Sequence, residues 1–334
     1  MKTISIFNQK GGVGKTTSVV NLAVALSYLD KKVLVIDMDP QANATTGLGI
    51  DKNKIDTSIY DLFYIASDEE EMKKISAKNE KEAKVEKDKK EELEKEVKKE
   101  EKNKSVGKRF IDLTGTSEKI IEEKSEEVSQ DNIGEKEEAK IEEKNTEVVE
   151  GIDQFIIKTK SGVDLIASEN SLSGLEVELV DLDPLERTRK LKEIIEKINT
   201  PYDFILIDCP PSLGLLSINA LVASNSIIIP IQTEYYALEG VSELMNTFEL
   251  VKGSLNKDLY VEGVLLSMFD KRTKLAYEVV EEVKKFFKDK VFMTMIPRNV
   301  KLAEAPSHGK SAIEYDAKSQ GAMAYISLAS EIIK

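Results

Sequence analysis

The sequence predicts an α/β fold in which a doubly wound, mostly parallel sheet carries helices on both faces. Short aliphatic runs alternate along the chain with longer stretches of helical pattern. These runs are continuous rather than alternately apolar and polar, which is typical of strands buried on both sides. A glycine-rich segment, residues 10–17, also joins the first aliphatic run directly to the first helical stretch.

The N-terminal strand–helix–strand unit sets this pattern. Residues 3–7 form a short β-rich run, an apolar helical stretch reaches about Leu29, and residues 33–36 form a second aliphatic run. Two strands joined by one helix of this length form a right-handed crossover, so we expect the two strands to be parallel.

Globular patterning resumes near residue 155 and continues through the rest of the sequence. Helical stretches are expected between further strands, one of them carrying Leu185 and Ile198, and a last helix is expected at 322–333. The further strands are expected at 155–157, 163–166, 204–207, 226–229, 261–266 and 291–295.

Residues 68–150 interrupt the pattern with a tract dominated by Glu and Lys. The tract contains 28 acidic and 20 basic residues, few aromatics and no regular apolar stripe. Low hydrophobicity with dense charge favours disorder or a solvated helix over a second hydrophobic core. We therefore predict one discontinuous α/β domain, 1–67 and 151–334, with a charged insertion.

Composition argues against several kinds of site. The sequence has one cysteine, Cys209, and one histidine, His308, which excludes an internal disulfide and argues against a cysteine- or histidine-based metal site. No apolar run is long enough to cross a bilayer and no secretory signal is recognisable, so we expect a cytoplasmic protein. The net charge of −13 falls mainly on the insertion, and a nearly balanced domain can still carry a local basic surface.

Residues 9–16 read Gln-Lys-Gly-Gly-Val-Gly-Lys-Thr and fit the phosphate-loop pattern G-x-x-x-x-G-K-[ST] except at its first position. The glycines let successive backbone N–H groups face phosphate oxygens, and the following helix adds its positive end. The pattern places Lys15 on the β- and γ-phosphates and the Thr16 hydroxyl on Mg²⁺. The predicted nucleotide contacts are Lys10, Gly11, Gly12, Val13, Gly14, Lys15, Thr16 and Thr17.

Two acidic segments follow buried strands, at the edge where a parallel sheet presents its carboxyl ends. One segment holds Asp37 and Asp39, and the other holds Asp208. A single aspartate after a strand is at least as often a helix cap. Two such segments beside a phosphate loop indicate instead a site for a metal ion and an attacking water.

The string Lys-Gly-Gly-Val-Gly-Lys-Thr-Thr resembles the deviant Walker A box of the ParA/MinD ATPase superfamily. Segments that resemble chromosomal ParA (Soj) proteins are 39–45, 207–212, 234–240, 296–300 and 302–307. The resemblance covers essentially 1–67 and 151–334. The charged insertion is a departure from the family's usual chain.

The resemblance implies an ATP- and Mg²⁺-dependent catalytic site shared between two subunits. Lys10 would reach across the dimer interface to the partner's nucleotide, much as an arginine finger does. Asp39 would orient the attacking water. Asp208, in a strand similar to a Walker B motif, would hold Mg²⁺, and Asp37 would support the metal shell.

The resemblance also implies a function. Such proteins form ATP-dependent homodimers that bind double-stranded DNA without sequence preference, and a ParB partner stimulates their slow hydrolysis, so that chromosome or plasmid DNA is segregated on the nucleoid. Adenine would be held by a Pro-Arg-Asn loop, here at Pro297 and Asn299. The matching DNA-contacting positions are Arg272 and Arg298, with Lys301 and Lys310 as weaker candidates.

Other branches of the superfamily are the alternatives. A MinD-like membrane-associated positioning ATPase would end in a basic amphipathic helix, whereas residues 324–334 contain a single lysine. A ParA-like ATPase that positions a protein cargo is not distinguished by the sequence. A cluster-carrying reductase would need more cysteines and a tyrosine kinase a terminal tyrosine cluster. A plasmid-type ParA with its own helix-turn-helix is disfavoured because nine residues precede Lys10.

Overall fold

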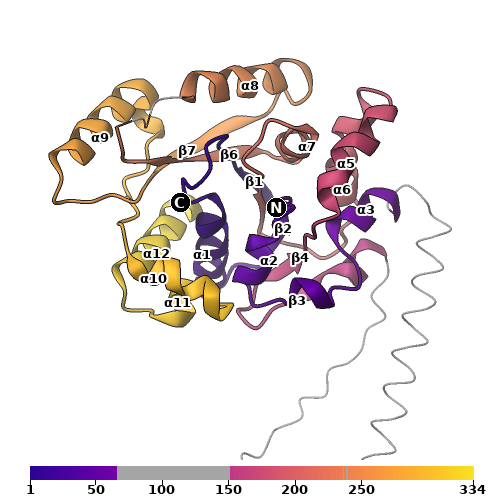
Figure 1. The fold of residues 1–334 in the computed structure, drawn as a ribbon, viewed down its shortest axis with the longest axis horizontal. Coiled ribbons are helices and arrows are strands. Elements are labelled where there is room, and N and C mark those ends of the chain that lie inside the picture. Colours follow the sequence, from indigo (N-terminus) through magenta and orange to yellow (C-terminus); the bar gives the residue numbers. More distant parts are fainter. Residues whose placement is uncertain (66–150, 236, 238–239) are drawn as a thin grey trace, which may run out of the picture. The chain divides into compact units, whose positions relative to one another are not determined.

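Seven strands form one sheet in the computed structural model, which describes residues 1–65, 151–235, 237 and 240–334 (Figure 1). The strand order is β3-β4-β2-β5-β1-β6-β7. All neighbouring strands are parallel except β3 and β4. The strands are β1 Lys2–Ile6, β2 Val33–Asp37, β3 Ile157–Lys158, β4 Asp164–Ile166, β5 Phe204–Asp208, β6 Ser226–Gln232 and β7 Tyr260–Ser267.

Helices connect these strands and cover the sheet (Figure 1). They are α1 Lys15–Tyr28, α2 Asn43–Gly47, α3 Ile59–Ile65, α5 Leu172–Glu178, α6 Lys190–Glu196, α7 Leu215–Ala223, α8 Val241–Ser254, α9 Lys274–Phe287, α10 Val300–Glu304, α11 Ala312–Tyr315 and α12 Gln320–Ile333. No helix among the described residues is long and apolar enough to span a membrane.

The side chains of the central strand β1 show that both faces of the sheet are covered. Ile4 and Ile6 point into a core that includes residues of α1 and α12. Ser5, between them, donates from Oγ to the carbonyl oxygen of Ala220 in α7 at 3.1 Å. Since successive side chains of a strand lie on opposite faces, α1 and α12 cover one face and α7 covers the other. The predicted doubly wound α/β fold is confirmed.

Two predicted strands differ from the structure. Residues 151–155 form a 3₁₀ helix, so β3 begins only at Ile157. The prediction of a strand at 291–295 is wrong, because this segment pairs with β7 only through an isolated bridge at Val291. The backbone N–H groups of Met293 and Thr294 instead donate to the Glu331 carboxylate at 2.7 and 3.1 Å. The predicted charged insertion, 68–150, lies outside the described residues.

Candidate nucleotide-binding site

Three segments far apart in the sequence meet at the carboxyl edge of the sheet. They meet because β5 lies between β1 and β2. The register pairs Asp208 with Ile6 on one side and with Asp37 on the other. The glycine loop after β1 and the acids at the ends of β2 and β5 are therefore neighbours, as the sequence predicts.

The glycine loop is fastened to the sheet on both sides. Asn8 donates from Nδ2 to the carbonyl oxygen of Pro230 at 2.7 Å, and its Oδ1 accepts the Lys10 N–H at 3.0 Å. Ser267, at the end of β7, donates to the carbonyl oxygen of Val13 at 2.8 Å. Gly14 has a φ of 92°, a left-handed conformation that glycine adopts without strain. The curled loop is thus a fixed feature of the fold.

Lys15 begins α1 and lies buried beneath the loop, with 6% of its surface exposed. Its Nζ donates to the carbonyl oxygen of Lys10 at 3.1 Å. Burial lowers the pKa of Lys15, and the nearby charge of Asp208 opposes that shift. The Lys15 ammonium group is thus held against the loop, where the phosphate-loop pattern places its lysine.

Asp208 is fully buried, and neither of its carboxylate oxygens accepts a hydrogen bond of ordinary geometry from the described residues. Burial raises its pKa well above the usual range, the charge of Asp37 adds to the shift, and the nearby Thr16 hydroxyl opposes it. A buried carboxylate with so little hydrogen bonding is costly. A hard divalent cation prefers oxygen ligands of this kind. The Asp208 carboxylate and the Thr16 hydroxyl therefore fit Mg²⁺.

Asp37 lies beside Asp208 in the register but has a different environment. Its Oδ2 accepts from both the backbone N–H and the hydroxyl of Thr45, each at 2.8 Å, and its Oδ1 accepts the Asp39 N–H at 3.1 Å. Burial raises its pKa to about 6, and the Thr45 hydrogen bonds oppose the rise. Asp37 therefore fixes the path of the chain after β2. Thr45 was not among the predicted site residues.

Asp39 is 7% exposed and lies near the Lys15 ammonium, whose pKa its charge helps to raise. Its Oδ1 accepts the Gln41 N–H at 3.0 Å, and its backbone carbonyl oxygen accepts the Ser168 hydroxyl at 2.8 Å. Ser168 follows β4, so a third strand helps to hold this loop. No sequence signal identifies Ser168 or Ser267, because their role depends on which strands are neighbours.

Lys10 has the opposite environment from Lys15. It is exposed, and its ammonium group makes no hydrogen bond or ion pair within the described part of the chain. Only its backbone is engaged, with Asn8 on one side and Lys15 on the other. The Lys10 side chain is therefore exposed and unpaired within the described residues.

The Pro-Arg-Asn segment lies beside the chain that leaves β7. Pro297 forms a parallel bridge with Phe269, and the Arg298 N–H donates to the Phe269 carbonyl oxygen at 3.1 Å. Asn299 caps α10, with its side-chain oxygen accepting the Lys301 N–H at 2.9 Å. Both predicted adenine-contacting residues are half-buried parts of an ordered turn.

Known proteins are similar to this chain in sequence and in fold. A family model described as an AAA domain matches residues 1–131 and 95–261. The sporulation initiation inhibitor protein Soj of Bacillus subtilis is 41% identical over 331 residues, covering 99% of this chain and 98% of Soj. The chromosome partitioning protein ParA of Myxococcus xanthus is 37% identical over 100% of this chain and 88% of its own length. The chain belongs to the Soj/ParA family of chromosome-partitioning ATPases.

A solved structure supports the fold of this Soj/ParA-family chain. Cobyrinic acid a,c-diamide synthase from Mycobacterium smegmatis, with bound ADP and magnesium, matches with a TM-score of 0.66 over 100% of this chain and 94% of that one. At 24% identity the likeness shows a shared fold.

Two of the four predicted DNA-contacting residues of this Soj/ParA-family chain are arginines paired with acids. Arg272 is 81% exposed, and its guanidinium binds the Asp270 carboxylate through two hydrogen bonds of 2.9 and 2.6 Å. The pairing pulls the pKa of Asp270 far below its usual range. Arg298 pairs with Glu234 at 3.2 Å. Both guanidinium groups are thus partly neutralised in the single subunit.

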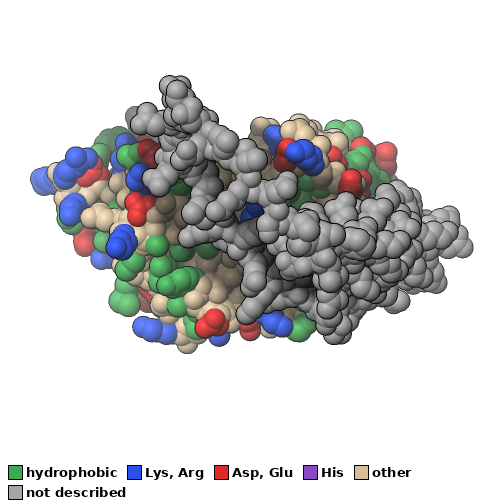
Figure 2. Space-filling view, turned by 90° about the horizontal axis from the view of Figure 1, so that it is seen from below, with side chains coloured by type: hydrophobic (Ala, Val, Ile, Leu, Met, Phe, Trp, Pro, Cys, Tyr) green, Lys and Arg blue, Asp and Glu red, His purple; other side chains and the backbone are tan. Residues whose placement is uncertain are grey.

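The two predicted lysines have different surroundings. Lys301 pairs with Glu304 at 3.0 Å and lies over the Tyr315 ring at 5.2 Å from its centroid. Lys310 is exposed. On the visible part of the face in Figure 2, several basic side chains lie along one side, with fewer acidic ones among them.

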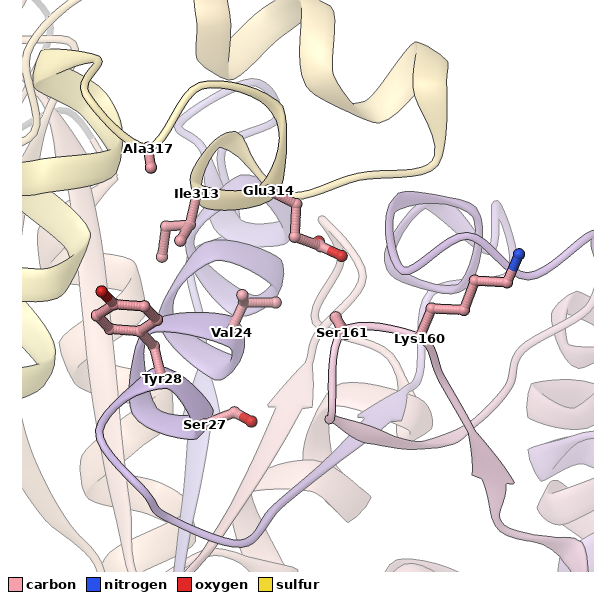
Figure 3. A pocket seen from close by; sticks show the side chains of 8 residues that line it. All are labelled: Val24, Ser27, Tyr28, Lys160, Ser161, Ile313, Glu314 and Ala317. Atoms are coloured by element: carbon pink, nitrogen blue, oxygen red, sulfur yellow. The ribbon is translucent and has the colours of Figure 1, made fainter. Parts of the chain in front are cut away.

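A separate hollow lies at the far end of α1 from the glycine loop (Figure 3). Its lining includes Val24 and Tyr28 of α1, Lys160 from the turn between β3 and β4, and Ile313 of α11. The 14 residues of α1 span about 20 Å, so this hollow is distinct from the nucleotide site.

Proposed function

We propose that this Soj/ParA-family chain binds ATP with Mg²⁺ and hydrolyses it slowly as a nucleotide-dependent dimerisation switch. The observation that carries the proposal is the meeting of a fixed phosphate loop, the buried Lys15 and the buried Asp208 carboxylate at one sheet edge. The bound ADP and magnesium of the Mycobacterium smegmatis fold neighbour support this choice of ligand.

In this proposal each residue of the site has a physical task. Backbone N–H groups of 11–17 and the Lys15 ammonium bind the β- and γ-phosphates. Thr16 and Asp208 hold Mg²⁺, which neutralises charge that develops on the phosphates. Asp39, held by Gln41 and beside Lys15, orients the attacking water. Asp37 supports the metal shell indirectly, by fixing the position of the Asp39 loop.

The dimer is proposed from the free side chain of Lys10. An exposed ammonium group at the edge of a phosphate loop can add positive charge to a nucleotide that a second subunit presents. ATP would therefore hold two subunits together, and hydrolysis would release them. Pro297 and Asn299 would contact adenine from the ordered turn after β7.

DNA and a ParB protein are the proposed partners. In this proposal Arg272, Arg298, Lys301 and Lys310 form one phosphate-binding surface when two subunits combine. In the single subunit the first three are paired with acids. Contacts with phosphates carry no sequence information, so binding should be non-specific and strongly salt-dependent. The dimer would therefore associate with the nucleoid, and a ParB partner would stimulate hydrolysis and segregate the DNA.

ATP turnover and dimerisation of Lys10→Ala test this function, with Lys15→Ala as the comparison. We expect Lys15→Ala to lose nucleotide binding. Lys10→Ala should keep it but should lose ATP-dependent dimerisation and the stimulation by DNA with a ParB peptide. Calorimetric binding, light scattering and phosphate release provide the three measurements. Full dimerisation and stimulated turnover in Lys10→Ala would contradict the shared site.

A further inference from the structure

Gln9 stands where the phosphate-loop pattern usually has its first glycine, and its carboxamide nitrogen is buried without a partner. The side chain as a whole is half-buried, but its Nε2 atom is buried. A carboxamide nitrogen donates and does not accept hydrogen bonds. An unpaired buried donor is unfavourable, so a ligand that supplies an acceptor would gain by meeting it.

The same edge of the sheet also holds buried acceptors that lack a hydrogen-bond partner. Among the described residues, four buried side-chain polar atoms lack a partner, namely Nε2 of Gln9, Nε of Arg187 and both carboxylate oxygens of Asp208. Ile6 pairs with Asp208 in the register, and Gln9 follows Ile6 by three residues. A magnesium-bound phosphate would supply partners for both groups, because it brings a cation for the Asp208 carboxylate and anionic oxygens for the Gln9 amide.

The neighbours of Gln9 are already used by the fold. Asn8 spans from the Pro230 carbonyl oxygen to the Lys10 N–H, and Lys15 donates to the Lys10 carbonyl oxygen. These contacts hold the loop without the Nε2 group of Gln9. The donor is therefore available to a ligand rather than needed for the shape of the loop.

We propose that Gln9 is a phosphate-binding residue whose Nε2–H donates to an oxygen of the β- or γ-phosphate of the bound nucleotide. The inference rests on the proposed nucleotide function and adds to it one donor that a glycine at this position does not have. Since a carboxamide is neutral, its contribution stays constant where lysine and carboxylate contributions change with pH.

Three substitutions test whether the Gln9 side chain acts as a hydrogen-bond donor or only fills space. Gln9→Met keeps the size and removes the donor, Gln9→Gly restores the usual residue of the pattern, and Gln9→Glu puts a negative charge near the phosphate. We expect calorimetric affinity for a non-hydrolysable ATP analogue with Mg²⁺ to fall about tenfold for the first two and further for the third. Gln320→Met, at an exposed glutamine of α12, is the matched control and should bind like the parent.

Two further measurements sharpen the test. Titration with ADP locates the contact, since an equal loss assigns it to the β-phosphate and a loss confined to the ATP analogue assigns it to the γ-phosphate. Thermal unfolding without nucleotide should show Gln9→Met at least as stable as the parent, while the stabilisation by the analogue shrinks.

Affinity like the parent's or tighter in both Gln9→Met and Gln9→Gly would overturn the proposal. So would a fall in the nucleotide-free stability of Gln9→Met with unchanged affinity, which would make Gln9 a purely structural residue. Failure of the parent chain to bind any nucleotide would instead overturn the proposed function, so the two failures are distinguishable.

Discussion

The ends of β2 and β5 carry aspartates in the same register, yet their surroundings differ. Asp37 and Asp208 pair across the two strands, and both are fully buried. Asp37 accepts three hydrogen bonds from Thr45 and the Asp39 backbone. Asp208 accepts none of ordinary geometry from the described residues. We therefore propose that Asp37 acts mainly by holding the chain after β2, and that Asp208, which only the Thr16 hydroxyl approaches, is left to bind a ligand.

The largest expected effect is on Asp208. In Asp208→Asn we expect Mg²⁺-dependent ATP turnover to fall by at least about 100-fold, because the metal loses its buried anionic ligand. The same change should raise nucleotide-free stability at neutral pH, since it replaces a carboxylate whose charged form burial penalises with a neutral amide. Phosphate release and urea unfolding measure the two effects. A variant that is less stable and fully active would reverse the comparison.

Asp37→Asn should have the opposite balance. An amide nitrogen would face the Thr45 donors, so we expect a loss of about 1–3 kcal/mol in the free energy of unfolding. Urea unfolding measures the loss, and the Mg²⁺ concentration for half-maximal turnover gives the second readout. That concentration should stay near the parent's if Asp37 acts through the Asp39 loop. A large increase would place Asp37 among the direct metal ligands.

The pH dependence of stability follows from the same pair. Asp37 has a pKa of about 6 in the folded chain against 3.8 when unperturbed, and the pKa of Asp208 is also raised. The folded state therefore binds more protons than the unfolded state between these values, so stability falls as pH rises through them. We expect urea midpoints in chelator to fall between about pH 4 and 6. If the urea midpoints rose over this window in both the parent and Asp37→Asn, the raised pKa values of Asp37 and Asp208 would not be the cause of the pH dependence.

A smaller effect is expected from the exposed pair of Arg272 and Asp270. Arg272→Ala or Arg298→Ala should weaken ATP-dependent DNA binding and reduce its salt dependence by about one phosphate contact, without affecting dimerisation. Asp270→Asn should strengthen DNA binding, because Arg272 loses its competing acidic partner. The gain should not exceed about fivefold, because an exposed ion pair contributes little free energy. Fluorescence anisotropy over a salt series measures both. DNA binding like the parent's in both arginine variants would remove these residues from the DNA surface.

The smallest expected effect is that of deleting the charged tract. We propose that 1–67 and 151–334 form the ATPase domain and that 68–150 is an insertion outside it. Removing 68–150 should leave both strand-end aspartates in place and ATPase and DNA binding unchanged. Turnover and DNA affinity of the deletion variant check this, and loss of either would assign the tract a functional role.

The fold and the location of the site were predictable because their signals are local. Continuous aliphatic strands that alternate with helices indicate a parallel sheet covered on both faces, and the glycine loop with Lys15 indicates a phosphate site. The strand predicted at 291–295 failed for a non-local reason. Its apolar pattern is suitable for a strand, but the Glu331 carboxylate, from the last helix, takes the N–H groups of Met293 and Thr294.

The sequence alone determined that two acids end buried strands beside a phosphate loop, because strand pattern and residue type are written in consecutive residues. Only the tertiary structure distinguished the two acids. Thr45 reaches Asp37 with both its N–H and its hydroxyl because the chain turns back after β2, whereas among the described residues Asp208 accepts no hydrogen bond of ordinary geometry. The same holds for Gln9, which in the sequence is only a departure from glycine. Hydrogen-bond satisfaction depends on every group that packs nearby, and that property exists only in the folded chain.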